Sequence, residues 1–403
     1  FHPGSIDAVL VTHAHIDHSG RIPMLIKNGF QGRIITTRLT ADLLDIMLQD
    51  SAHIQEQDAE YQNRKNKRAG RPEVQPIYTV ADAMQVREYI QPCEYGQKVQ
   101  VTDDVTAEFI DAGHLLGSAS VEMWMEEGGV EKKIVFSGDI GNKHKPLIRD
   151  PAYVKEADYA VMESTYGGRL HQKGKDHVTE LARIVQETLD RGGNVVIPAF
   201  AVGRTQELLY YFRQIKSQHL IHGHDNFEVY VDSPLAVEAT HVFKENQAEC
   251  YDEETRELVE EGINPISFPG LRLSVTSDES ININFDTKPK VIISASGMCD
   301  AGRIRHHLKH NLWRKECTVI FAGYQAVGTI GRALVDGAKE VKLFGESIDV
   351  EAHIEVLHDI SGHADQNGLL TWALAFEKKP QQFFVVHGND DVCDRFAELL
   401  TEK

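Results

Sequence analysis

Four side chains that can bind metal ions lie within six residues of the sequence, in the pattern H-x-H-x-D-H over residues 13–18. The pattern follows directly on an apolar run, 6–11, which predicts a β-strand. On an extended segment, residues two apart point to the same side, so His13 and His15 can share one metal ion. Asp17 and His18 begin the next predicted helix and can serve a second ion nearby. Solvated loop histidines are the alternative interpretation.

The ligand types indicate zinc, because imidazole nitrogens and carboxylate oxygens bind Zn²⁺ at ~2.0–2.2 Å. The five cysteines are scattered and form no C-x-x-C pair, which disfavours an iron–sulfur cluster or a structural zinc site. Their odd number also argues against a disulfide framework and favours a reducing, cytoplasmic location. They are Cys93, Cys250, Cys299, Cys317 and Cys393.

Two metal ions would need about three ligands beyond these four. His114 lies between two glycines that allow close approach of the backbone. Asp139 follows a predicted strand at 133–136, and His387 follows another at 383–386. Each of the three alone could be a capping or packing residue. Together with the first motif they complete a set of seven ligands.

Strand-like and helix-like patterns alternate along the chain, which predicts an α/β fold. Four predicted strands end in polar residues of ligand type, and these ends are expected to converge on one site. The four are 6–11, 133–136, 159–162 and 383–386. Helical patterns cover 40–68, 79–90, 176–191, 204–218, 301–310 and 365–376. The middle of the chain reads as a second α/β unit, with predicted strands at 194–197, 228–231, 290–294 and 318–321.

The composition excludes several classes of protein. The chain has 42 Lys and Arg against 61 Asp and Glu, a formal net charge of −19, so it is not basic throughout. With 41% hydrophobic and 26% charged residues it is globular and not disordered. No apolar run approaches the ~18 residues that span a bilayer, and the first residues lack a secretory signal, so we expect a soluble protein without a membrane partner. Basic clusters at 64–71 and 303–315 are solvated helix faces or nucleic-acid contacts.

These motifs resemble those of the metallo-β-lactamase superfamily and, within it, the β-CASP nucleases. The resemblance rests on residues 13–18, on His114 and Asp139, and on Glu163 in M-E-S-T-Y and His363 in S-G-H-A-D. Three further segments resemble bacterial and archaeal relatives of the mRNA 3′-end cleavage nuclease. They are P-A-F-A-V-G-R at 198–204, D-S-P-L-A at 232–236 and S-G-M-C-D-A-G-R at 296–303.

The resemblance implies an α/β fold, a metallo-β-lactamase αββα sandwich with an inserted α/β β-CASP domain. We expect the lactamase domain at residues 1–167 and 346–403 and the β-CASP domain at 168–345. The family's first motif, an aspartate on an early strand, is expected to precede residue 1 together with the first strands of the lactamase domain. The inserted domain is expected to hold single-stranded RNA over two zinc ions.

The resemblance also implies a role for each site residue. One Zn²⁺ would be held by His13, His15 and His114, the other by Asp17, His18 and His387, with Asp139 bridging them. Two such ions would activate a water molecule for in-line attack on a phosphate. Asp17 would orient that water, and His363 would protonate the leaving 3′ oxygen with its pKa raised by Glu163.

His387 also bears on the substrate, because RNA-acting members of the family carry histidine at this position and DNA-repair members carry valine. We therefore expect hydrolysis of single-stranded RNA, endonucleolytic, exonucleolytic or both, by a cytoplasmic enzyme that could form a homodimer. Strand-to-helix junctions can offer backbone N–H groups to a phosphate. The residues expected to contact RNA are Arg204, Ser296, Arg303, Ser361 and Gly362.

Two other functions stay open at this point. A small-molecule hydrolase of the same superfamily, such as a thioesterase, lactonase or glyoxalase, would share the first motif but would not need the insert with Glu163 and His363. A non-catalytic scaffold of an RNA-processing complex typically loses metal ligands, and all seven are present here. Both observations favour a nuclease.

Two further histidine groups are not expected to bind metal. His222 and His224 repeat the H-x-H spacing without a following Asp-His pair, which favours a surface turn. His306, His307 and His310 lack the glutamate of H-E-x-x-H and are expected to line a basic helix face.

Overall fold

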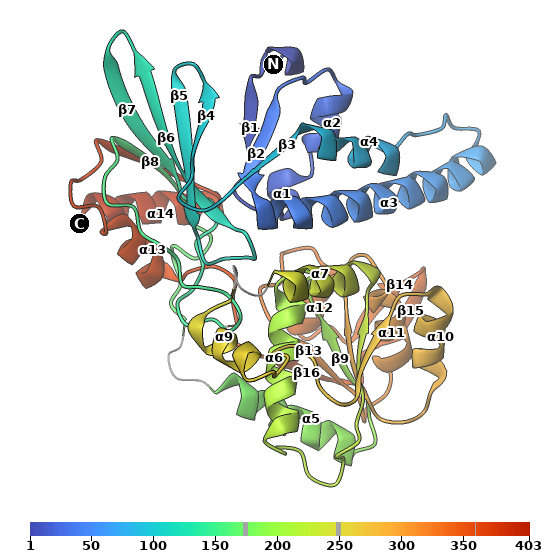
Figure 1. Ribbon diagram of the computed structural model, residues 1–403. Coiled ribbons are helices and arrows are strands. Elements are labelled where there is room, and N and C mark those ends of the chain that lie inside the picture. Colours follow the sequence, from blue (N-terminus) through green and yellow to red (C-terminus); the bar gives the residue numbers. More distant parts are fainter. Residues whose placement is uncertain (172–175, 247–250, 359) are drawn as a thin grey trace. The chain divides into compact units, whose positions relative to one another are not determined.

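The computed structural model describes residues 1–171, 176–246, 251–358 and 360–403, so Cys250 lies outside the described residues (Figure 1). The chain forms two compact units. Unit 1 comprises Phe1–Leu170 and His363–Lys403, and unit 2 comprises His171–Gly362.

Unit 1 contains two β-sheets that pack face to face. The smaller sheet is parallel, and its strands in spatial order are β1 (Ala8–Leu10), β2 (Arg33–Thr37) and β3 (Ile90–Cys93). The larger sheet is mixed, and its strands in spatial order are β17 (Gln382–Val386), β8 (Tyr159–Glu163), β7 (Val130–Phe136), β6 (Ala119–Glu127), β5 (Val105–Asp111) and β4 (Lys98–Thr102). Buried side chains of both sheets, among them Ile35 and Phe109, form one apolar cluster.

Helices flank this pair of sheets. On the larger sheet, Leu369, Trp372 and Phe396 from two helices pack against Val135 and Ala160. On the smaller sheet, the long helix α3 contacts β2 and β3. The helices of unit 1 are α1 (Ile16–Ser19), α2 (Ile22–Lys27), α3 (Arg38–Ala69), α4 (Val80–Met84), α13 (Gln366–Ala373) and α14 (Asp390–Thr401), with 3₁₀ turns at Pro3–Ser5 and Gln85–Tyr89. The predicted αββα arrangement is confirmed.

Helix α3 shows how local signals set the ends of an element. The side chain of Thr37 accepts a hydrogen bond from the Thr40 backbone N–H and caps the first turn, and Gly70 ends the helix with a φ of 63°. The predicted helix at 79–90, in contrast, is α-helical only over Val80–Met84; it continues as the 3₁₀ turn Gln85–Tyr89 and stops where Ile90 begins β3. Residues from Ile90 onward pair with β2, and this long-range pairing overrides the local helical pattern.

Unit 2 is built on a parallel sheet. Its strands in spatial order are β11 (Leu271–Ser274), β10 (Val229–Asp232), β12 (Val291–Ser294), β9 (Val195–Pro198), β13 (Thr318–Phe321) and β16 (His353–Val356). A separate hairpin is formed by β14 (Glu340–Leu343) and β15 (Glu346–Asp349). The helices are α5 (His177–Asp190), α6 (Arg204–Ser217), α7 (Pro234–Glu245), α9 (Glu253–Glu260), α10 (Ser277–Phe285), α11 (Ile304–Asn311) and α12 (Ile330–Val335).

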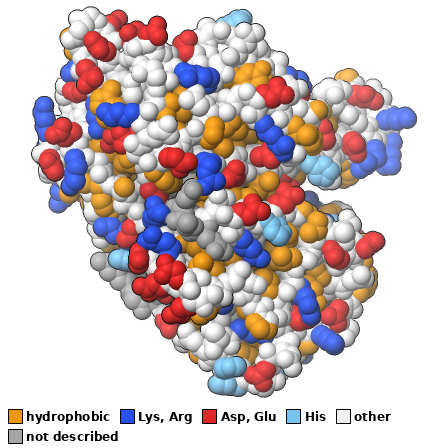
Figure 2. Space-filling model, viewed as in Figure 1, with side chains coloured by type: hydrophobic (Ala, Val, Ile, Leu, Met, Phe, Trp, Pro, Cys, Tyr) orange, Lys and Arg blue, Asp and Glu red, His pale blue; other side chains and the backbone are white. Residues whose placement is uncertain are grey.

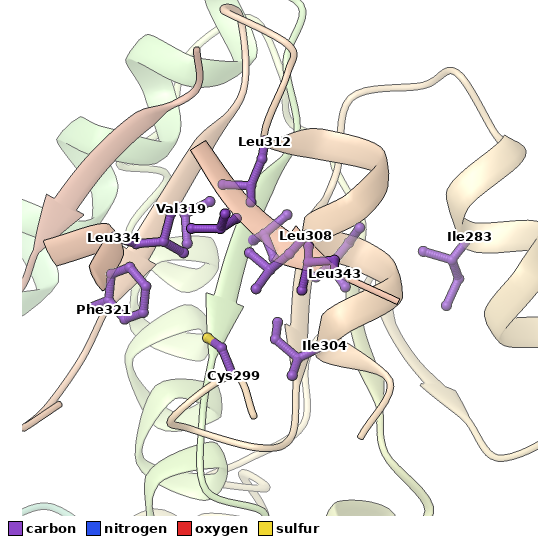
Figure 3. Packing of buried hydrophobic residues seen from close by; sticks show 12 residues of the cluster. Ile283, Cys299, Ile304, Leu308, Leu312, Val319, Phe321, Leu334 and Leu343 are labelled. Atoms are coloured by element: carbon purple, nitrogen blue, oxygen red, sulfur yellow. The ribbon is translucent and has the colours of Figure 1, made fainter. Parts of the chain in front are cut away.

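The core of unit 2 lies between this sheet and its helices. Figure 3 shows Leu308 of α11 and Leu312, directly after this helix, beside Val319 and Phe321 of β13, with Leu334 of α12 next to them. All five side chains are fully buried. A continuous apolar layer of this kind fixes the strand ends from which the loops of unit 2 emerge.

The structure divides the chain at different residues from those expected. The compact units meet between Gly362 and His363 and not between the expected 345 and 346, because β16 pairs with β13 and β15 pairs with β14. The expected boundary at 167 and 168 shifts by three residues, to Leu170 and His171. The pairing of β16 with the distant strand β13, which has no local sequence signal, decides the boundary at Gly362.

The surface agrees with the composition. On the face seen in Figure 2, Lys and Arg side chains are interspersed with Asp and Glu. None of the helices in the described part of the chain combines the length and the apolar character that crossing a membrane requires.

Candidate metal centre

The seven predicted ligands come together in unit 1, at the ends of strands. His13 and His15 follow β1, His114 follows β5, Asp139 follows β7 and His387 follows β17. Asp17 and His18 lie on α1, directly after the first pair. The expected convergence of strand ends therefore holds for these residues.

The first group consists of His13, His15, His114 and Asp139. The Nδ1 atom of His15 lies 3.1 Å from Nε2 of His13 and 3.2 Å from Nε2 of His114. The Oδ2 atom of Asp139 lies 3.4 Å from Nε2 of His13 and 3.5 Å from Nε2 of His114. A tetrahedral ion with bonds of ~2.0–2.1 Å holds its ligands about 3.3–3.4 Å apart, so the four atoms fit a zinc ion.

The second group consists of Asp17, His18 and His387. The Nε2 atoms of His18 and His387 are 3.1 Å apart. The Oδ2 atom of Asp17 lies 3.7 Å from the first of these nitrogens and 3.5 Å from the second. The Asp17 side chain is 66% exposed, so this group is open to solvent on one side. A substrate could reach it there.

Asp139 links the two groups. While its Oδ2 atom belongs to the first group, its Oδ1 atom lies 3.4 Å from Nε2 of His18. Oδ1 also lies 3.4 Å from Nδ1 of His387, and it is a buried atom for which the described residues provide no partner of hydrogen-bond geometry. A buried carboxylate oxygen without a partner is costly, and a cation between the groups would remove that cost. The donor set thus fits two neighbouring zinc ions.

The protonation of the first group also suits a metal. Burial lowers the pKa of His13 and His114, and it lowers the pKa of His15 to about 3. These rings are therefore neutral at pH 7 and each has a nitrogen lone pair to offer. Burial would raise the pKa of Asp139, but its contacts with His13 and His18 hold that pKa far below the ordinary value. Asp139 is consequently a carboxylate.

The hydroxyl of Thr165 selects the tautomer of His387. The sequence analysis did not predict a role for Thr165. The Thr165 hydroxyl donates to the backbone carbonyl of His387 at 3.1 Å, so toward the ring it can only accept. It lies 3.1 Å from Nδ1 of His387, which must then carry the ring proton. The hydrogen bond with Asp17 raises the pKa of His387 to about 9, so a metal ion would displace the Nε2 proton and bind the lone pair that faces His18 and Asp17. Thr12 makes a similar contact with Nδ1 of His13 at 3.1 Å.

Glycine is required where two ligand loops touch. A Cβ atom on Gly141 would lie 1.7 Å from the carbonyl oxygen of Gly113, which directly precedes His114. The Gly141 N–H donates to the Ala112 carbonyl at 2.8 Å. The loop after Asp139 is therefore held against the loop of His114, and any side chain at position 141 would separate them.

Glu163 and His363 form a pair beside the metal ligands. Nδ1 of His363 lies 3.0 Å from Oε2 of Glu163 and 3.9 Å from Oδ2 of Asp139. The buried Glu163 carboxylate also accepts the Ile140 backbone N–H at 2.5 Å. Burial alone would lower the pKa of His363, but the charge and hydrogen bond of Glu163 raise it above the ordinary value. His363 is thus poised to hold a proton next to the two groups.

The residues predicted to contact RNA lie in unit 2, where both arginines are engaged by partners. The guanidinium of Arg204 donates to Glu207 and to the Ile360 carbonyl, each at 2.7 Å. The guanidinium of Arg303 donates to Asp232 at 2.7 Å and to the Val275 carbonyl at 2.6 Å. Both therefore stabilise unit 2. The remaining three residues are Ser296, whose hydroxyl donates to the Ala301 carbonyl at 3.2 Å, and Ser361 and Gly362, which immediately precede His363.

The other histidine groups have structural partners. Nε2 of His224 lies 2.8 Å from Asp190 on the surface. The prediction that His307 lines a basic face is wrong, because the residue is fully buried with Nε2 2.6 Å from Asp232. In the described ranges of the chain, every group that could hold a metal ion draws its ligands from unit 1.

Sequence comparisons agree with this geometry. The chain matches the family description "Metallo-beta-lactamase superfamily" over residues 1–192, "Beta-Casp domain" over 205–334 and "Zn-dependent metallo-hydrolase RNA specificity domain" over 347–403.

Three named proteins are similar to this chain over nearly its whole length. "Ribonuclease TTHA0252" of Thermus thermophilus is 33% identical over 402 residues, which cover 99% of this chain and 85% of that protein. "RNase J-like protein" of Methanocaldococcus jannaschii is 33% identical over 388 residues, 95% of this chain and 82% of that protein. "Transcription termination factor FttA" of the same organism is 30% identical over 404 residues, and the chain spans 60% of its length. The chain belongs to the β-CASP family of metal-dependent hydrolases in the metallo-β-lactamase superfamily.

Proposed function

We propose that the protein is a zinc-dependent ribonuclease that hydrolyses phosphodiester bonds of single-stranded RNA with two ions per chain. The observation that carries this proposal is the pair of ligand groups joined by Asp139, with Glu163 and His363 beside them. The names of two relatives, a ribonuclease and an RNase J-like protein, and the match to an RNA specificity domain support the choice of RNA.

The ligand residues prepare the attack on the phosphate. Zinc ions, when bound, supply an activated water molecule and positive charge for the phosphate oxygens. Asp17, the most exposed of the ligand side chains, orients the attacking water through its carboxylate. The water oxygen bonds to phosphorus, and the bond from phosphorus to the 3′ oxygen breaks on the opposite side.

The Glu163–His363 pair completes the reaction. His363 gives its proton to the leaving 3′ oxygen, because an alkoxide is a poor leaving group unless it is protonated. Glu163 stays ionised and holds the ring through Nδ1, so that the proton at Nε2 is the one transferred. The products are a 3′-hydroxyl and a 5′-phosphate, and a proton from solvent restores His363.

Location and assembly form part of the same proposal. Four cysteines of the described chain, Cys93, Cys299, Cys317 and Cys393, are free thiols, as expected of a cytoplasmic protein. A homodimer is compatible with the family and is tested by light scattering on the purified protein.

The proposal is tested by incubating the zinc-loaded protein with 5′- and 3′-labelled single-stranded RNA, matched DNA and duplex RNA. We expect the single-stranded RNA to be cut fastest, and the product lengths to separate endonucleolytic from exonucleolytic cleavage. Rapid turnover of thioester or lactone substrates, without RNA cleavage, would replace the proposal by a small-molecule hydrolase.

A further inference from the structure

The carboxyl ends of three neighbouring strands place three loops of unit 2 next to one another. β9 pairs with β12 on one side and with β13 on the other, and all three run parallel. The next strands in the sequence, β10, β11 and β12, lie on one side of β9, whereas β13 and β16 lie on its other side. The loop 199–203 is thus flanked by the loops 295–303 and 322–329. In open α/β sheets, such a reversal of strand order is where ligands bind.

Two exposed aromatic side chains lie in these loops. Phe200 follows β9 and is 48% exposed, and Tyr324 follows β13 and is 45% exposed. A single exposed aromatic residue needs no explanation. Two of them on adjacent strand ends, at the reversal of strand order, indicate a surface that presents rings to a ligand.

The loop 295–303, which follows β12, packs closely against Phe200 through Gly297. A Cβ atom on Gly297 would lie 3.2 Å from the Phe200 backbone nitrogen and 3.3 Å from its ring atom Cδ2. The Gln325 side chain donates to the Gly297 carbonyl at 3.0 Å. Gly297 therefore lies against Phe200 and is tied to the residue next to Tyr324, which makes the three loops one connected surface.

The loops are held rigidly by hydrogen bonds. The Phe200 carbonyl accepts from the Thr205 backbone N–H at 3.2 Å and from the Thr205 hydroxyl at 2.8 Å. The buried Gln206 side chain accepts from the Gly203 N–H at 2.7 Å and donates to the Ala201 carbonyl at 3.1 Å. A ring that is presented by an ordered loop loses little conformational entropy on binding.

The chemistry of this surface favours nucleobases over phosphates. The nearby guanidinium groups of Arg204 and Arg303 are engaged by Glu207 and Asp232 inside unit 2. The rings of Phe200 and Tyr324 can instead stack on any base, because every base has a π-face.

We infer that Phe200 and Tyr324 form a stacking platform for bases of single-stranded RNA. The inference rests on the proposed function and adds to it the residues of unit 2 that bind the substrate without regard to sequence. If stacking provides the affinity, RNA that lacks its bases should bind more weakly than intact RNA does in added salt, because salt weakens only the contacts with phosphates.

The test measures stacking directly with the zinc-loaded full chain. Single-stranded RNA that carries 2-aminopurine is mixed with protein in a stopped-flow instrument, and its fluorescence is followed before cleavage. We expect quenching by the wild type. The double variant Phe200→Ala/Tyr324→Ala should lose most of the quenching and raise Kd about tenfold or more. Phe200→Tyr and Tyr324→Phe should keep both, and Phe285→Ala, which removes a 70% exposed phenylalanine of α10, is the matched control.

The outcomes separate this inference from the proposed function. Equal quenching and Kd for wild type and double variant, with RNA cleaved by the wild type, would overturn the platform and leave the ribonuclease standing. A wild type that neither binds nor cleaves RNA would overturn both. A double variant that binds RNA normally but changes its oligomeric state in light scattering would show that the rings contact protein, which also overturns the inference. RNA with abasic sites, bound equally weakly by all variants, would support it.

Discussion

The two oxygens of Asp139 face different histidines: Oδ2 lies 3.4 Å from Nε2 of His13, and Oδ1 lies 3.4 Å from Nε2 of His18. Since these histidines belong to separate ligand groups, one carboxylate is shared by both sites. Ions held by the two groups would share this one side chain, which follows β7. Loss of this side chain should affect both sites together.

The first prediction concerns metal content. Purified wild type, resupplied with zinc, should contain two zinc ions per chain, and Asp139→Ala should lose much of the metal and its activity. Elemental analysis against protein concentration measures the stoichiometry. Asp103→Ala, which removes an exposed carboxylate in the turn between β4 and β5, is the control and should retain both ions. A folded wild type with one ion or none would rule out the dinuclear site.

The second prediction concerns the tautomer of His387. Thr165→Val removes the hydroxyl that accepts from Nδ1 but keeps the shape of the side chain, so zinc affinity should fall by about 10–100-fold. Thr165→Ser keeps the hydroxyl and should bind zinc nearly as the wild type does. Competition with a chromogenic chelator measures both affinities. Equal affinities of the valine variant and the wild type would remove the role of Thr165.

The third prediction concerns pH and the stability of unit 2. Burial would raise the pKa of Asp232, but hydrogen bonds from His307, Ser280 and Arg303 lower it to about 2. Between the ordinary pKa and this value, the unfolded chain binds the proton and the folded chain does not. Asp232 therefore contributes stability that is present above about pH 4 and is lost as the pH falls through about 2.

The size of this contribution follows from the shift, at about 2 kcal/mol. Asp232→Asn should lower the free energy of unfolding at pH 7, and the difference from wild type should shrink as the pH falls from 4 toward 2. Urea unfolding followed by circular dichroism across this range measures it. A difference that does not depend on pH would show that the carboxylate charge is unimportant and that only the packing of the side chain matters.

The residues of the candidate metal centre could be predicted from sequence because each follows a short apolar strand or lies in a compact motif. The contacts that orient them could not. Thr165 reaches His387 across 222 residues of sequence, and the spacing of neither residue indicates the other. Only the E-S-T-Y run, in which Thr165 follows Glu163 by two residues, marked the segment as part of the site.

The same limit applies to the charged residues of unit 2. Arg204 and Arg303 resemble phosphate-binding arginines at strand ends, but each is neutralised by an acidic partner. Glu207 is three residues from Arg204 and could have been considered, whereas Asp232 is 71 residues from Arg303. The burial of His307 depends on the same distant aspartate. A charge pattern along a helix shows which residues are basic but not which of them are paired in the fold.

The last prediction isolates the proton transfer by His363. His363→Ala should leave zinc content and RNA affinity nearly unchanged, because His363 belongs to neither ligand group, while the cleavage rate should fall by about 10²–10⁴-fold. Glu163→Gln should have a smaller effect of the same kind. The double variant should be little worse than His363→Ala alone, because residues that act as one unit are not additive.

A substrate with a sulfur atom in place of the leaving 3′ oxygen tests whether the lost step is protonation. A thiolate leaves without a proton, so this substrate should restore much of the rate of His363→Ala while changing the wild type little. Single-turnover cleavage of matched oxygen and sulfur substrates by both proteins gives the comparison. If the defect of His363→Ala is equally large on the two substrates, His363 is not the general acid. In that case His363, which follows Ser361 and Gly362 in its loop, would bind the scissile phosphate instead.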